Sequence, residues 1–183
     1  MADQSVIWST YAFEGKLINV RIDTVELPNG NRREREIVEH PGAVAVVPVL
    51  DDGRIALVRQ YRPAVGRGML ELPAGTVEPG ENATSTAQRE LEEETGLRAG
   101  SMARLVQFFT SPGWCNEELV LFVATNISHG QRSPEDDEDI DVELVARGDI
   151  PRLFREGMVA DAKTMVGLSI YLGLSLSPEQ GGE

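Results

Sequence analysis

The chain has 183 residues, of which 41% are hydrophobic and 26% are charged, and this is enough for one domain with an apolar core. Its formal net charge of −13 argues against a nucleic-acid-binding protein and against a partner membrane with an anionic surface. The single cysteine, Cys115, excludes an internal disulfide and suits a reducing compartment. We find no secretory signal pattern and no apolar stretch long enough to span a bilayer, so we expect a cytoplasmic protein.

The first 42 residues predict a small antiparallel sheet. Apolar and polar residues alternate at about the strand period in residues 6–13, 17–27 and 32–39. The Asn29-Gly30 pair between the last two segments is a strong hairpin signal. Because a few short strands are marginal on their own, we expect residues 1–42 to pack on the main domain or to form a dimerisation element.

The rest of the chain predicts strands and helices in mixed order. Residues 43–50 are almost entirely apolar and indicate a buried central strand, which a turn at residues 51–53 ends. Further expected elements are strands at 54–60, 105–109, 119–124 and 140–145, short helices at 151–156 and 162–172, and a longer helix at 83–95 between the caps Asn82 and Gly96. We therefore expect an α/β (α+β) fold, an α/β/α sandwich on a mixed sheet, over residues 43–177, with a flexible tail at 178–183.

The predicted helix at residues 83–95 carries an unusual cluster of carboxylates. Glu90, Glu93 and Glu94 are spaced so that they share one helix face, where each like-charge pair costs about 0.2–0.5 kcal/mol. They also lie near the helix C-terminus, where the macrodipole disfavours anions. A solvated charged face is the ordinary explanation of such a pattern. A rigid set of carboxylates is also how a protein holds a hard cation such as Mg²⁺.

The residues around this cluster complete a much longer pattern. Residues 75–97 follow the spacing G-x5-E-x7-R-E-U-x-E-E-x-G-U, where U is a bulky aliphatic residue. At typical residue frequencies, a chance match has a probability of about 10⁻⁸–10⁻⁹ per starting position. The segment resembles a complete Nudix box, the signature of hydrolases that act on a nucleoside diphosphate linked to another group.

The resemblance implies a cofactor and a role for each matching residue. It implies hydrolysis by water at phosphorus with two or three Mg²⁺ or Mn²⁺ ions. Glu90 and Glu94 match the principal metal ligands, Glu93 an additional ligand and Ala74 a ligand through its backbone carbonyl. The remaining residues of the pattern match structural positions, a bracing salt bridge and two backbone turns, and these are Glu81, Arg89, Gly75 and Gly96.

Three further features resemble the ADP-ribose pyrophosphatase subgroup of this family. They are the Q-Y-R-P and E-L-P-A-G runs at residues 60–63 and 71–75, Pro112 at fifteen residues after the box, and an acidic segment at residues 134–142. The subgroup implies cleavage of ADP-ribose to AMP and ribose 5-phosphate. Matching substrate-binding residues are Arg62, Pro112, Gly113 and Glu117.

The same resemblance implies a catalytic carboxylate and a subunit arrangement. Glu138 is the first candidate for the carboxylate that accepts a proton from the attacking water, Asp136 is the second, and Glu93 is a further candidate. The N-terminal strands would build a homodimer and part of the adenosine pocket, with one of the aromatic residues Trp8, Tyr11 and Phe13 stacking on adenine.

For several of these residues, ordinary structural roles without a part in catalysis remain open. The acidic segment could simply be solvated, Arg62 could form an ordinary surface salt bridge, and Trp114 could be a packed aromatic residue. Two rival functions also remain. The nearer one is a pyrophosphatase of GDP-mannose or another nucleotide sugar, and the more distant one is a non-catalytic Nudix ligand sensor, which the intact carboxylates and the acidity disfavour.

Overall fold

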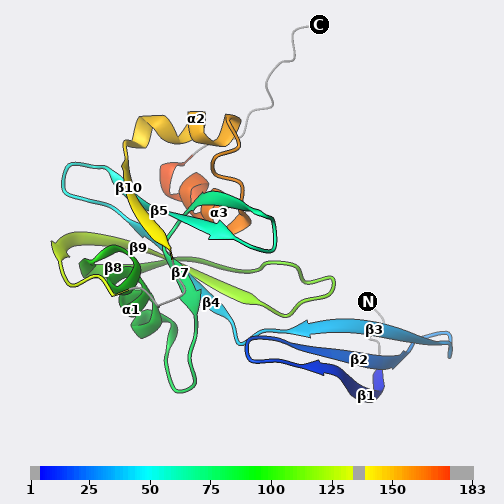
Figure 1. The fold of residues 1–183 in the computed structure, drawn as a ribbon. Coiled ribbons are helices and arrows are strands. Elements are labelled where there is room, and N and C mark those ends of the chain that lie inside the picture. The colour runs from blue at the N-terminus through cyan, green and yellow to red at the C-terminus, as the bar shows by residue number, and fades with distance from the viewer. Residues whose placement is uncertain (1–4, 134–138, 174–183) are drawn as a thin grey trace, which may run out of the picture.

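The computed structural model describes residues 5–133 and 139–173, so the predicted tail and the candidates Asp136 and Glu138 lie outside the described residues. The strands of the main body lie between helices on opposite sides, and a long N-terminal sheet projects from this body (Figure 1). The elements are β1 (Ser5–Glu14), β2 (Asn19–Glu26), β3 (Arg32–Glu39), β4 (Ala43–Pro48), β5 (Ile55–Arg62), β6 (Arg67–Glu71), β7 (Ala74–Thr76), α1 (Ala83–Thr95), β8 (Leu97–Phe109), β9 (Glu118–His129), β10 (Ile140–Val145), η1 (Arg147–Asp149), α2 (Ile150–Arg155) and α3 (Ala162–Leu172). Within the described residues, no helix has both the length and the apolar character needed to cross a membrane.

Strand β4 is the centre of the sandwich, and both of its faces are buried. It pairs parallel with β9 and antiparallel with β7 in the sheet β7-β4-β9-β8, while β10, β5 and β6 form a second, antiparallel sheet. Ala45 and Val47 pack into the apolar cluster covered by α2 and α3, and Val44 and Val46 pack into the cluster covered by α1. This alternation places one helical layer on each side of a mixed sheet, so the predicted α/β/α sandwich is confirmed.

The expected strands are present, but several differ in length. Strands β8 and β9 run over Leu97–Phe109 and Glu118–His129, well beyond the expected residues 105–109 and 119–124. Much of the additional part of β8 is exposed, so its residues lack the alternation that reveals a half-buried strand. The short strands β6 and β7 were not expected, because three to five residues carry too little periodicity.

The N-terminal sheet has the strand order β1-β2-β3 and is joined to β4 by the three residues 40–42. Val38 at the end of β3 exchanges backbone hydrogen bonds with the turn that follows β8: its N–H donates to Trp114 O (2.7 Å), and its carbonyl accepts from Asn116 N (3.1 Å). The Asn116 side chain in turn accepts from His40 N (2.8 Å). The connection between the two sheets is therefore fixed by hydrogen bonds from its start.

Helix α3 is docked closely on the strand segment that leads to β7. The Thr164 hydroxyl in its first turn accepts a hydrogen bond from Leu72 N (2.9 Å) in a buried position. One turn later, a Cβ at Gly167 would lie only 2.7 Å from Leu72 Cδ1, so this helix approaches more closely than a larger residue would allow.

Helix α1 begins and ends where the sequence predicts. Asn82 forms a capping box, because its side chain accepts from Thr84 N and Ser85 N while the Ser85 hydroxyl accepts from Asn82 N. Gly96 ends the helix with a φ of 71°, a left-handed conformation that favours glycine, and its N–H donates to Glu92 O.

A salt bridge connects α1 to the loop before it. Arg89 Nε lies 2.9 Å from Glu81 Oε1, and the Thr86 hydroxyl donates to the same carboxylate (2.8 Å). The hydrogen bonds from Arg89 and then from Thr86 lower the pKa of Glu81 from 4.5 to about 2. The bracing role that the sequence resemblance implied for Glu81 and Arg89 agrees with this geometry.

We expect Glu81→Gln to lower the free energy of unfolding at neutral pH. Because the folded-state pKa lies below the unfolded value, the ionised carboxylate stabilises the fold above pH 4.5, and this contribution is lost as the pH falls from 4.5 to about 2. Urea unfolding at about pH 7 and about pH 3 should show a difference between wild type and variant that shrinks at the lower pH. A difference that stays constant would contradict a stabilising role of the Glu81–Arg89 salt bridge. Glu156→Gln, which removes the exposed partner of Arg152 on α2, is the control and should change little.

Candidate active site

The acidic face of α1 lies against β7. Glu94 is almost fully buried, with 2% of its surface exposed, and its Oε2 accepts a hydrogen bond from Ala74 N (3.2 Å). Glu90 lies beside the next residue, since a Cβ added to Gly75 would overlap the Glu90 carboxylate. Only glycine therefore lets this carboxylate approach the strand. The two predicted principal ligands thus face the backbone of Ala74–Gly75.

Arg89 contacts two of the carboxylates on this face of α1. One of its terminal nitrogens lies 2.8 Å from Glu90 Oε1 and 2.9 Å from Glu93 Oε2. Its hydrogen bond with Glu81, followed by the charge of Glu90, raises the pKa of Arg89 above its usual value. Within residues 5–133 and 139–173, no three His, Cys, Asp or Glu side chains already stand together as a ready cation site. In this arrangement Arg89 is the counter-charge for Glu90 and Glu93.

These residues share one pocket with Arg62. Its lining comprises Leu17, Arg62, Ala74, Gly75, Thr76, Glu78, Arg89, Glu90 and Glu93. Three carboxylates and two guanidiniums face it, and the buried Glu94 lies directly behind Ala74. An anionic substrate would meet an excess of negative charge here unless cations were bound with it. Carboxylate oxygens and a backbone carbonyl at the pocket wall are the donors that a hard divalent cation prefers, so these residues fit such an ion.

Arg62 ends strand β5 and forms a two-pronged ion pair with Glu71 at the end of β6. The distances are 2.9 Å from Nε to Oε1 and 2.8 Å from Nη2 to Oε2. Glu71 is buried, with 1% of its surface exposed, whereas 37% of the Arg62 side chain is exposed. Burial alone would raise the pKa of Glu71, but the hydrogen bonds from Arg62 and Lys163 outweigh it, so the pKa is lowered. Arg62 therefore forms a salt bridge with Glu71 and also lines the carboxylate pocket.

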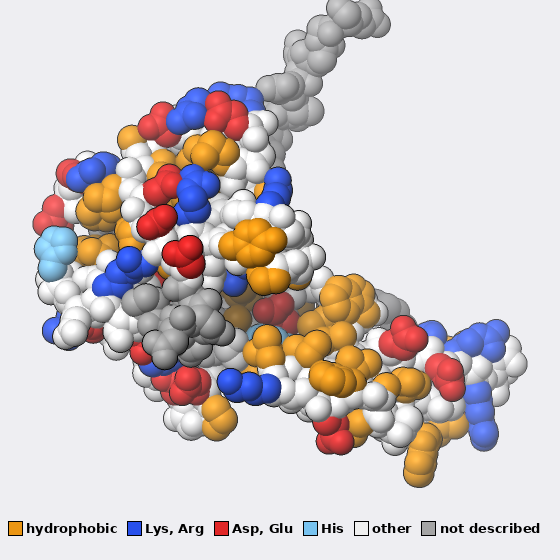
Figure 2. Space-filling view, in the orientation of Figure 1, with side chains coloured by type: hydrophobic (Ala, Val, Ile, Leu, Met, Phe, Trp, Pro, Cys, Tyr) orange, Lys and Arg blue, Asp and Glu red, His pale blue; other side chains and the backbone are white. Residues whose placement is uncertain are grey.

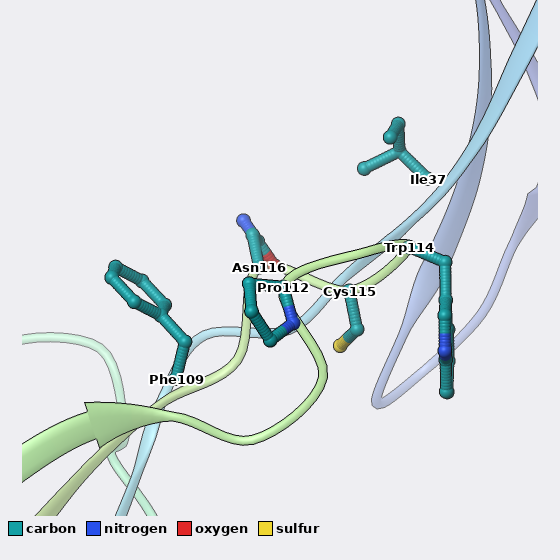
Figure 3. Close-up of a pocket in the computed structure, with 6 residues that line it drawn as sticks. All are labelled: Ile37, Phe109, Pro112, Trp114, Cys115 and Asn116. Atoms are coloured by element: carbon teal, nitrogen blue, oxygen red, sulfur yellow. The ribbon is translucent and has the colours of Figure 1, made fainter.

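The predicted substrate-binding residues in the turn at residues 110–117 lie outside the lining of the carboxylate pocket. Pro112 lines a separate apolar hollow with Ile37, Phe109, Trp114, Cys115 and Asn116. Figure 3 shows Pro112, Cys115 and Asn116 in the middle of this turn, with Phe109 on one side and Trp114 on the other. Glu117 accepts the Thr110 hydroxyl (2.6 Å) and lies 3.9 Å from Nδ1 of His40. Neither Pro112, Gly113 nor Glu117 lines the carboxylate pocket, so their roles stay predictions.

Several pocket residues were not expected from the sequence. Leu17 reaches the pocket from the connection between β1 and β2, Thr76 is the last residue of β7, and Glu78 follows that strand. No local pattern marks Leu17, because its place depends on how the N-terminal sheet meets the main body. Glu78 could have been suspected, since it lies inside the box segment between Gly75 and Glu81.

The chain that leads into residues 134–138 is bonded to the end of α1. Ser133 N donates to Glu93 O (3.0 Å), Arg132 Nε donates to Glu94 O (2.8 Å), and Gln131 N donates to a carboxylate oxygen of Glu92 (3.2 Å). Residues 131–133, which precede the acidic segment in sequence, are thus bonded to the turn of α1 that carries two of the predicted metal ligands.

Comparisons with known proteins agree with this geometry. A sequence model of the NUDIX domain family matches residues 39–166. Over 174 residues, 94% of each chain, the protein is 41% identical to one of Bacillus subtilis (strain 168) named ADP-ribose pyrophosphatase. It is 38% identical, also over 94% of each chain, to one of Bacillus methanolicus named methanol dehydrogenase activator. A crystal structure of an ADP compounds hydrolase matches 92% of this chain and 91% of that chain, with a TM-score of 0.82 and 22% identity.

The two kinds of match carry different weight. At 22% identity the solved structure supports the fold alone. The family match spans the box, the strands β4, β5 and β7 that face it, and Arg62, and the 41% relative extends over nearly the whole chain. The chain therefore belongs to the NUDIX domain family.

Proposed function

We propose that this protein is a Nudix pyrophosphohydrolase that cleaves ADP-ribose with water to AMP and ribose 5-phosphate. The observation that carries the proposal is the single pocket shared by the carboxylates of α1, the Ala74–Gly75 backbone and the Arg62 guanidinium. A diphosphate and its divalent counter-ions require these groups together. We place the reaction in the cytoplasm, which the single cysteine suits.

The choice of ADP-ribose rests on relatives as well as on the pocket. The Bacillus subtilis relative carries that activity in its name and aligns over 94% of this chain. The Bacillus methanolicus relative is named for the activation of a dehydrogenase, so the names alone do not select one substrate. GDP-mannose and other nucleotide sugars are the rival substrates, and turnover measured side by side separates them.

In this proposal Glu90 and Glu94, with Glu93 and the Ala74 carbonyl, hold two or three Mg²⁺ or Mn²⁺ ions. Bound ions of this kind neutralise the diphosphate and lower the pKa of a bound water. Arg62 donates hydrogen bonds to diphosphate oxygens and orients them. The water oxygen forms a new bond to phosphorus, the bridging P–O bond breaks, and its electron pair stays on the leaving phosphate. A carboxylate accepts the proton of the water.

Glu94→Gln should keep the fold and lower kcat for ADP-ribose by about 100-fold or more, because it removes one charge from the metal-binding set. The variant and wild type should be assayed at saturating Mg²⁺ with ADP-ribose, GDP-mannose, NADH and a diadenosine polyphosphate. Near wild-type turnover by Glu94→Gln would refute the metal role, and a better substrate than ADP-ribose would refute the substrate. Glu156→Gln is the control for loss of a carboxylate far from the pocket.

We further propose that the catalytic carboxylate is Glu138, with Asp136 as the second candidate and Glu93 as the third. The hydrogen bond from Ser133 N to Glu93 O supports this choice, because it fixes the residue that directly precedes the acidic segment at the end of α1 that carries Glu93 and Glu94. A general base needs to reach a water in the pocket, and Ser133 stands only a few residues before both Asp136 and Glu138 in the sequence.

Glu138→Gln should lower kcat by about 10²–10⁴ with little change in KM, the usual effect of losing a general base. Steady-state kinetics of Glu138→Gln, Asp136→Asn, Glu93→Gln and the Glu138/Asp136 double variant decide among the three. A silent Glu138→Gln with a crippled Asp136→Asn would select Asp136. If the double variant is also silent and only Glu93→Gln is impaired, the base lies on α1.

We also propose a homodimer in which residues 1–42 form the dimerisation element, residues 43–177 the hydrolase domain and residues 178–183 a tail. Every residue of β1 is exposed, including Trp8 (68%), Tyr11 (49%) and Phe13 (55%). Figure 2 shows apolar side chains gathered along the projecting sheet. An exposed apolar edge strand favours pairing with another chain, and a second copy covers it by symmetry.

The same assembly would complete the substrate site. Leu17, next to β1, already borders the carboxylate pocket, which supports a role for the N-terminal sheet there. We assign adenine stacking to one of Trp8, Tyr11 and Phe13, and binding of the terminal ribose to Glu117 beside Pro112 and Gly113.

Trp8→Glu combined with Phe13→Glu should convert the dimer to a monomer, since buried charges at an apolar interface are unfavourable. Light scattering after size-exclusion chromatography measures the mass directly, and a monomer has 20.0 kDa. Ile170→Glu, which places the same charge at an exposed apolar position on α3, should leave the dimer intact. A wild type that is monomeric at micromolar concentration would contradict the proposal.

A further inference from the structure

Two cations from different parts of the chain bind the same buried carboxylate. Glu71 receives Arg62 from β5 on one side and Lys163 from α3 on the other, and both contact its Oε2. Lys163 also lies 2.9 Å from Asp161, the N-cap residue of α3. Only 15% of the Lys163 side chain is exposed, so this ion pair is much less screened by water than a surface pair.

Lys163 contributes to how firmly Glu71 holds Arg62. The charges of Arg62, Lys163, Glu71 and Asp161 cancel as a group, since Asp161 pairs with Lys163. The contribution of Lys163 is therefore a second contact that fixes the Glu71 carboxylate. Nε and Nη2 of Arg62 bond Glu71, which leaves Nη1 outside the pair. Arg62 is thus held by a fixed carboxylate while it faces the pocket.

Helix α3 also holds the strand segment that carries the pocket wall. Next to Glu71, Leu72 N donates to the Thr164 hydroxyl, and Ala74 follows two residues later with its N–H bonded to Glu94. The residues after Lys163 therefore support the same stretch of backbone from which Glu71 projects. A displacement of the start of α3 would move Glu71 and, with it, the Arg62 guanidinium.

We propose that Lys163 is a positioning residue for substrate binding: its ammonium shares the buried Glu71 carboxylate with Arg62 and keeps the Arg62 guanidinium oriented toward the substrate diphosphate. This inference rests on the proposed contact between Arg62 and the diphosphate. Lys163 itself acts through Glu71 and Arg62.

The test is a double-mutant cycle between Lys163 and Arg62. Lys163→Met keeps most of the unbranched side chain and removes the charge, while Lys163→Arg keeps the charge. We expect Lys163→Met to raise KM for ADP-ribose and the Kd for inorganic pyrophosphate with Mg²⁺ by about 10-fold, with kcat changed by less than about twofold, because lost uniform binding appears in KM. Lys163→Arg should recover most of this loss. Arg152→Met, which removes a cation from an exposed ion pair on α2, is the matched control.

In the Arg62→Ala background, Lys163→Met should have almost no further effect on either constant, since the two residues act as a unit. Independent effects that multiply would overturn the proposal, and so would a fall in kcat at unchanged KM. If wild type binds pyrophosphate but does not cleave ADP-ribose, the proposed substrate is wrong and the cycle in Kd still decides on Lys163. If wild type does not bind pyrophosphate, both are wrong.

A second measurement needs no substitution of Lys163, Glu71 or Arg62. The chain has only two lysines, Lys16 and Lys163, so ¹³C-lysine labelling gives two Cε resonances, which Lys16→Arg assigns. Adding pyrophosphate and Mg²⁺ should shift the Lys163 resonance in wild type, because its carboxylate partner is shared with the ligand-binding Arg62. An unshifted Lys163 resonance under saturation would overturn the proposal even if Lys163→Met fails to fold.

Discussion

Repulsion among the carboxylates of α1 is the constraint around which the site is built. Glu90, Glu93 and Glu94 crowd the last two turns of the helix, where the macrodipole is also unfavourable to them. The structure offsets this cost locally: Arg89 contacts two of the three, and Glu94 is buried against a backbone N–H. The caps and the salt bridge to Glu81 fix the helix ends, so the charges cannot relax apart. The helix holds a set of oxygen donors that favours a cation.

The fold was predictable where the sequence carries local signals. The bounds of α1 and α3 agree with the predicted residues 83–95 and 162–172, because capping residues mark both starts and a glycine follows both ends. The extra length of β8 was not predictable, since pairing with β9 stabilises residues that lack alternation. The short strand β7 forms through its pairing with β4 alone, which no property of three residues can reveal.

In the candidate site, too, some residues could be predicted from local sequence signals and others depend on tertiary structure. The box residues Glu94 and Glu90 lie beside Ala74 and Gly75, because a helix face and an adjoining loop are determined by nearby residues. Their role as metal ligands stays a prediction. Lys163 lies 92 positions from Glu71 in the chain, and no spacing rule connects them. The turn with Pro112 lines a different hollow, since its place depends on how β3 meets the main body. Sequence therefore identifies the charged centre of the site and leaves the surrounding contacts to tertiary structure.

The three-residue connection between β3 and β4 has a mechanical consequence. Hydrogen bonds from Val38 and His40 to the turn at residues 114–116 leave no free length of chain at this joint. The projecting sheet is thus an arm joined to β4 by a short hydrogen-bonded connection, and not by a flexible linker. Two molecules that meet through such arms would keep their pockets at one separation and one orientation.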